Sequence, residues 1–79
     1  MKVILRLFAS YRELAGTGRI ELDLPQGTDI SGLLRTVRRD FSSFPDAPVH
    51  VAVNTEFVAS GYELHEGDEI ALLPPVSGG

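Results

Sequence analysis

The segment "KVILRLF", residues 2–8, is apolar at nearly every position. In an extended chain, every second side chain from Val3 points to one side, and every second side chain from Ile4 points to the other. Strands with apolar residues on both faces belong in the middle of a sheet. A second segment of this kind, "EIALL" at residues 69–73, stands near the other end of the chain. We predict that the two segments lie side by side as the central strands of one sheet.

The residues between these strands predict the remaining elements. "RIELDL" (19–24) alternates apolar and charged residues, which is typical of a half-buried edge strand. In "DISGLLRTVRRDF" (29–41), apolar residues recur at helical spacing after Asp29, a residue type that caps helix N-termini. "VHVAV" (49–53) predicts a strand, and "FVA" (57–59) predicts a short partner strand. The sequence therefore predicts an α+β fold, a mixed sheet of about five strands with one main helix packed across one face.

Two shorter segments connect these elements. "ASYRELAG" (9–16) predicts a helical turn that ends at Gly16, because glycine readily adopts the left-handed conformation after a helix. "HEGD" (65–68) predicts a tight turn in which Gly67 has a positive φ. Several acidic residues surround this turn, but they lack the ligand spacing of a calcium loop. We therefore interpret them as a solvated turn.

Composition limits what the chain can do. With 79 residues we expect a single domain, with a globular core over residues 1–73 and an extended tail over residues 74–79. The net charge is −4, so we expect no nucleic-acid partner, because such binding depends on neutralising phosphates. The first apolar run is short and is interrupted by Arg6, so we expect no signal peptide and no membrane contact, and we place the protein in the cytoplasm.

The residues that usually carry catalysis or bind metals are few. The absence of cysteine excludes a disulfide framework, a cysteine-ligated metal and a thiol nucleophile. His50 alternates with valines on a predicted strand and His65 lies in a predicted turn, so spacing gives neither a catalytic partner. We expect no metal site, and we do not expect the chain to be an enzyme on its own.

The C-terminal segment "LLPPVSGG", residues 72–79, carries the strongest chemical signal. Pro74 and Pro75 lack N–H donors and hold the chain extended, and the four residues after them span about 13 Å. Gly78 and Gly79 have no Cβ, so they fit a narrow channel that leads to another protein's active site. The terminal carboxylate reacts only after activation, for instance as an acyl-adenylate. A frayed end or an expression scar is the alternative.

Three segments resemble the sulfur carrier family of molybdenum cofactor biosynthesis, to which the small subunit of molybdopterin synthase belongs. They are "MKVILRLFASYRELAG" (1–16), "VAVN" (51–54) and "LHEGDEIALLPPVSGG" (64–79). The resemblance runs in register through the chain and fails only over the loop Ser42–Pro48. It implies a ubiquitin-like β-grasp fold.

The resemblance also implies a mechanism. An adenylating enzyme similar to ubiquitin-activating enzymes would use ATP to form an acyl-adenylate at Gly79, which is then converted to a thiocarboxylate. The charged carrier would insert its tail into the large subunit of molybdopterin synthase, where the sulfur passes to a cyclic pterin precursor. This chain would bind no cofactor itself. The inserted residues would be Pro74, Pro75, Val76, Ser77 and Gly78.

A partner-binding surface is expected beside the tail. If the two central strands are parallel, Phe8 and Leu73 both leave the sheet on the face away from the helix, and an exposed apolar patch there indicates an interaction site. Phe57, after "VAVN", occupies a position that resembles one the family uses in the same contact. Arg12 is a further candidate, which would pin the tail or pair with the partner. The alternatives are minor-core packing for the three apolar residues and a surface salt bridge for Arg12.

Two other functions stay open. Carriers for thiamine synthesis or tRNA thiolation share the fold and the Gly-Gly end, although "PPVSGG" and "YRELAG" favour the molybdopterin carrier. A non-catalytic β-grasp binding module is the alternative from a different class. The negative charge argues against an RNA-binding module, and we expect the natural chain to stop at Gly79, which argues against a module taken from a longer protein.

Overall fold

The computed structural model describes residues 1–41, 44 and 49–74. The predictions for Val76, Ser77, Gly78 and Gly79, for Pro75, and for the loop Ser42–Pro48 apart from Phe44 therefore lie outside the described residues. The elements in chain order are β1 (Lys2–Leu7), α1 (Ala9–Ala15), β2 (Arg19–Asp23), α2 (Ile30–Asp40), β3 (His50–Val53), β4 (Glu56–Phe57) and β5 (Glu69–Leu73).

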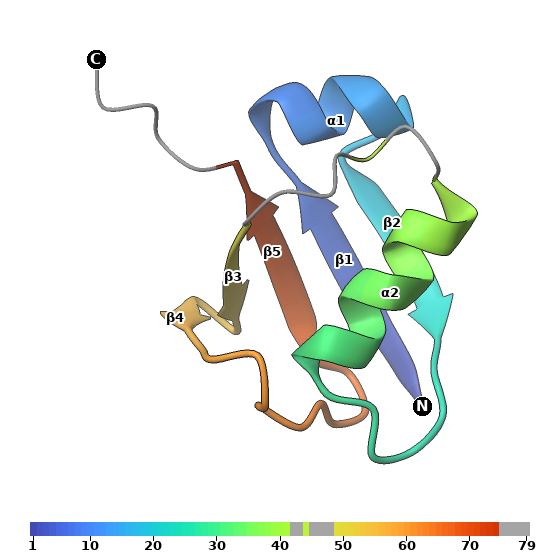
Figure 1. Ribbon diagram of the computed structural model, residues 1–79, viewed down its shortest axis with the longest axis vertical. Helices are drawn as coiled ribbons and strands as arrows, with labels where there is room; N and C mark the ends of the chain where they lie inside the picture. Colours follow the sequence, from blue (N-terminus) through green and yellow to red (C-terminus); the bar gives the residue numbers. More distant parts are fainter. Residues whose placement is uncertain (42–43, 45–48, 75–79) are drawn as a thin grey trace.

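The described strands form one mixed sheet in the order β2-β1-β5-β3-β4 (Figure 1). Strands β1 and β5 pair in parallel, with Leu5 opposite Ile70 and Leu7 opposite Leu72, and the other pairs are antiparallel. The two segments that are apolar on both faces thus lie side by side at the centre, as predicted. β2 lies at one edge, also as predicted, and the α+β fold class is confirmed.

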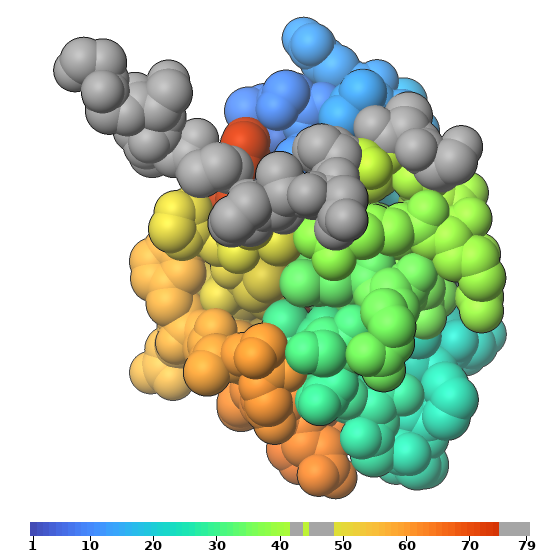
Figure 2. All heavy atoms as spheres, in the orientation of Figure 1, coloured from blue at the N-terminus to red at the C-terminus, as the bar shows by residue number. Residues whose placement is uncertain are grey.

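Helix α2 covers one face of this sheet (Figure 1). Its side chains Ile30, Leu33 and Val37 recur at helical spacing and are buried in one cluster with Leu5 and Ile70 of the central strands. Figure 2, from the same side, shows atoms of α2 in front of these strands. The sequence pattern of 29–41 therefore places the helix where its apolar face completes the core.

The ends of the helices follow the predicted residues. Asp29 caps α2, because its Oδ1 accepts a hydrogen bond from the backbone N–H of Gly32 at 2.9 Å. Gly16 ends α1 in the left-handed conformation, with φ 76°. The segment before it forms a seven-residue helix, longer than the helical turn that we predicted. Its Tyr11 reaches the core at 4% exposure, which adds packing to a segment whose own pattern is weak.

The strands on the β4 side are shorter than predicted. The predicted strand 57–59 is wrong beyond Phe57, because β4 contains only Glu56–Phe57. β3 begins at His50, one residue later than expected. Asn54 and Thr55, both with positive φ, make the tight turn that joins β3 to β4. β4 pairs with β3 alone, so its length is set by the two positions that this turn aligns.

The turn before β5 is organised by Asp68, which is only 8% exposed. Its carboxylate accepts hydrogen bonds from the side-chain amide of Asn54 at 3.0 Å and from the backbone N–H of His65 at 2.9 Å. The side-chain carbonyl of Asn54 accepts a third bond, from the N–H of Glu69 at 3.1 Å. Our interpretation of these acidic residues as a solvated turn is therefore wrong for Asp68, which ties the turn to the end of β3.

We expect Asn54→Ala to lower the free energy of unfolding by about 2 kcal/mol, because it removes two hydrogen bonds and leaves the buried Asp68 with one donor fewer. Alanine also tolerates the φ of 49° at this position less well than asparagine does. Urea unfolding measures the change. Glu56→Ala, on the neighbouring strand, is the control and should stay within about 0.5 kcal/mol of wild type. Equal stabilities of the two variants would contradict this role for Asn54.

Candidate partner-binding face

We call the face of the sheet opposite α2 the open face. On β5, Leu72 is buried on the α2 side, so the alternation of the strand turns Ala71 and Leu73 to the open face. The antiparallel register places Ala52 and His50 of β3 directly opposite them. Ala71, Leu73 and Ala52 therefore form a small apolar area across β5 and β3 on the open face, and His50 borders it.

Phe57 and Leu73, two of the predicted partner-binding residues, lie on the same half of the open face. Phe57 is 74% exposed, which is too much for the minor-core alternative. Its ring meets the ring of His50 edge-on with centroids 6.2 Å apart, and His50 stands opposite Leu73 in the strand ladder. Leu73 itself is half-buried. His50 therefore links the two apolar residues, a neighbour that the sequence pattern placed only on the polar side of its strand.

Phe8 borders a hollow on the open face. It is 42% exposed and directly follows β1. Because β1 and β5 are parallel, Phe8 follows β1 at the edge of the sheet where Leu73 ends β5. The hollow has a volume of about 420 Å³. Its other lining residues are Arg6, Asn54, Thr55, Glu69 and Ala71.

The tail begins at the same edge of the sheet. Pro74, the last described residue, is half-buried and follows β5 without an intervening turn. Figure 1 shows that β1 and β5 end together at this edge, beside α1. A partner that holds the tail would therefore also meet Phe8 and Leu73, so the geometry supports the predicted docking surface.

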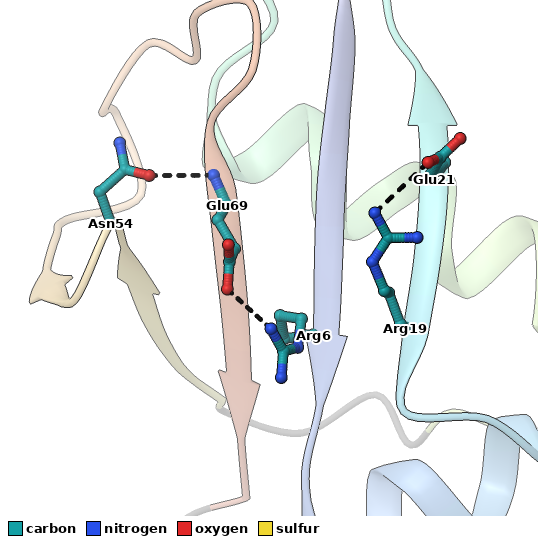
Figure 3. Close-up of polar contacts among 5 residues, drawn as sticks. All are labelled: Arg6, Arg19, Glu21, Asn54 and Glu69. Atoms are coloured by element: carbon teal, nitrogen blue, oxygen red, sulfur yellow. Dashed lines mark hydrogen bonds and ion pairs between the residues drawn. The ribbon is translucent and has the colours of Figure 1, made fainter.

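Arg12 does not form the surface salt bridge that was its alternative, at least with the residues that the structure describes. Its side chain lies over Gly18, where a Cβ would come within 3.3 Å of Nε. Arg6, by contrast, is paired: its Nη1 lies 2.9 Å from Oε1 of Glu69 (Figure 3). Sequence reasoning missed Arg6 and Glu69 as residues of this face, because only the pairing of β1 with β5 brings them together.

Within residues 1–41, 44 and 49–74, no three His, Asp or Glu side chains are arranged to hold a metal ion. Neither helix in this part of the chain is long and apolar enough to cross a membrane. What the open face offers is exposed apolar surface with charged groups around it, which suits contact with another protein.

Comparison with known proteins gives consistent matches. A family model described as the ThiS family matches residues 5–79. The molybdopterin synthase sulfur carrier subunit of Drosophila yakuba is 36% identical over 83 residues, covering 100% of this chain and 92% of that protein. The protein of the same name from Arabidopsis thaliana is 31% identical over 81 residues, covering 100% of this chain and 84% of that protein.

A solved structure is similar as well. The putative molybdopterin converting factor, subunit 1, from Pyrococcus furiosus superposes with a TM-score of 0.89 at 31% identity, covering 96% of this chain and 99% of that one. Fold and sequence therefore point to the same group of proteins.

Proposed function

The chain belongs to the ThiS family and matches molybdopterin synthase sulfur carrier subunits over all of its residues, and from this membership we propose that it carries sulfur for molybdenum cofactor biosynthesis. The ubiquitin-like β-grasp fold expected from the resemblance is confirmed. The observation that carries the proposal is the match at 36% and 31% identity through the whole chain, including the segment that ends in Gly-Gly.

The chemistry takes place at the carboxylate of Gly79. The carboxylate attacks the α-phosphate of ATP, which releases pyrophosphate and leaves an acyl-adenylate. A donor that supplies sulfur as hydrosulfide then displaces AMP, and the terminal carboxylate becomes a thiocarboxylate. The chain contains no cysteine, so the backbone terminus is the only place where it could carry this sulfur. ATP would be bound by the adenylating enzyme, and this chain would bind no cofactor.

Two partners follow from this chemistry. The adenylating enzyme would activate Gly79, and the large subunit of molybdopterin synthase would receive the tail from Pro74 to Gly78 and pass the sulfur to a cyclic pterin precursor. The exposure of Phe8 and Phe57 beside the start of the tail supports docking through the open face. We also propose that this chain acts in the cytoplasm.

Sulfur delivery to thiamine or to tRNA is the second candidate. The ThiS family model supports sulfur carriage in general. The named relatives that match over the whole chain are molybdopterin synthase subunits, which favours the first function. A binding module without sulfur chemistry would leave the Gly-Gly end without a role.

The test is a mass measurement. We expect the chain, incubated with its adenylating partner, ATP and a sulfur donor, to gain the difference between one sulfur atom and one oxygen atom. Fragmentation should place the gain in the C-terminal peptide. The large subunit and the pterin precursor should then return the mass to its original value. A chain that is never charged, or that is charged but not discharged by the large subunit, would contradict the proposal.

A further inference from the structure

A second hollow lies at the β2 side of the open face, and three arginines line it. Its volume is about 350 Å³. We call it the arginine hollow; its lining residues are Arg6, Leu7, Phe8, Arg12, Thr17, Gly18 and Arg19. The chain has only seven Lys and Arg residues and a net charge of −4. Nearly half of its positive side chains therefore converge on one small surface of an acidic protein.

The stability of the free chain does not explain this arrangement. Arg6 and Arg19 are direct cross-strand partners of β1 and β2, and like charges in that position destabilise a sheet. Arg6 is compensated by Glu69 at 2.9 Å, and Arg19 by Glu21 at 3.4 Å (Figure 3). All four side chains are about half exposed, with 44% to 55% of their surface accessible, so these pairs contribute little.

Arg12 completes the set without an ion-pair partner among the described residues. Gly18, directly before β2, has no Cβ, and this leaves room for the Arg12 side chain to lie over it, near Arg6 and Arg19. Three arginines thus line the hollow, and the carboxylate partners of two of them, Glu69 and Glu21, are not among its lining residues. A further anion would relieve the repulsion between Arg6 and Arg19 and pair with Arg12.

We propose that the arginine hollow receives carboxylate side chains of a partner protein, and, resting on the proposed function, that this partner is the large subunit of molybdopterin synthase. Arg6 and Phe8 line both the arginine hollow and the apolar hollow, so the two form one continuous surface. Guanidinium groups bind carboxylates through two parallel hydrogen bonds. Half-exposed arginines beside exposed phenylalanine match the polar rim of a protein interface around its apolar centre.

Titration calorimetry with the large subunit tests the inference, at about 50 mM and about 300 mM salt, because screening distinguishes a charged contact from an apolar one. We expect Arg12→Gln to bind about tenfold more weakly than wild type at the lower salt and to lose part of the salt dependence. Arg19→Gln should also lower the affinity and its salt dependence. The thermal midpoints of both free variants should match wild type, since their arginines serve the partner and not the fold.

Arg35→Gln is the matched control, because Arg35 is exposed on α2 and the substitution removes the same charge from the opposite side of the sheet. Its affinity should equal that of wild type. An equal loss in Arg35→Gln, or no loss in Arg12→Gln, overturns the inference while leaving the proposed function in place. A wild-type chain that is not bound by the large subunit contradicts the proposed function, and the arginine hollow then loses its partner as well.

Discussion

Deletion of Gly79 is expected to abolish sulfur transfer and to leave the thermal unfolding of the domain unchanged. The deletion moves the terminal carboxylate back by about 3.5 Å. A misplacement of about 1 Å already lowers the rate of a positioned reaction about a hundredfold, so neither adenylation nor sulfur delivery should be measurable. The fold should not respond, because the buried cluster is built from residues between Val3 and Leu72. Mass spectrometry of the charged chain and dithiolene synthesis measure the two losses.

Three further variants distinguish the effect of tail length from the effect of side-chain volume. One residue added after Gly79 should be as damaging as the deletion, because the wrong atom then occupies the reacting position. Gly78→Val keeps the length and should block entry into a narrow channel by bulk. Ser77→Ala keeps both length and slenderness and is the control, with near-normal charging. A Gly79 deletion that still supports dithiolene synthesis at the normal rate would show that the tail is a frayed end.

The fold was predictable because its sheet is encoded by local alternation. Both alternating sets of side chains are largely apolar in Lys2–Phe8 and in Glu69–Leu73. Such a pattern fits a central strand, because only a central strand buries or half-buries side chains on both of its faces. Residues 19–24 alternate strictly, and Arg19–Asp23 of this segment form the edge strand β2. Helical spacing after Asp29 fixed α2 in the same way.

What the sequence did not reveal depends on contacts between elements. Asp68 appears in an acidic turn, and its burial follows only when Asn54, at the end of β3, is brought beside it. The length of β4 likewise depends on where the turn at Asn54 aligns it with β3. Local pattern gives neither result, because Asn54 and Asp68 meet only in the folded chain and the end of β4 is set by its pairing with β3.

The candidate site likewise has a part that the sequence predicted and a part that it did not. Alternation, together with the expected parallel pairing of the two central strands, placed Phe8 and Leu73 on the face away from α2, and Leu7 and Leu72 beside them do belong to the core. The arginine hollow could not be found in this way. Its arginines come from β1, α1 and β2, and they meet only after the antiparallel register of β1 and β2 has set Arg19 opposite Arg6.

The double variant Phe8→Ala/Phe57→Ala is expected to lower affinity for the large synthase subunit by about a thousandfold. Truncation of a buried apolar anchor at an interface often costs about 2 kcal/mol or more, which is about thirtyfold for each residue. Phe8 and Phe57 are 42% and 74% exposed in the free chain, so a partner can still bury much of each ring. Phe8 follows β1 and Phe57 ends β4, and we expect the effects of the two substitutions on affinity to add. Leu73→Ala should also weaken binding, but Leu73 is half-buried, so its unfolding must be followed in parallel.

Leu14→Ala is the matched control for this experiment. Leu14 is 43% exposed, almost the same as Phe8, but it lies on α1 and lines neither hollow of the open face. If exposed apolar surface in general drove association, Leu14→Ala would weaken binding as Phe8→Ala does; if the open face is the docking surface, only the phenylalanine variants will. Thermal unfolding of all variants should stay close to wild type, because none of the three side chains belongs to the buried cluster. Normal affinity of the double variant would therefore mean that the partner binds a different face, and the tail would have to enter the large subunit without help from the sheet.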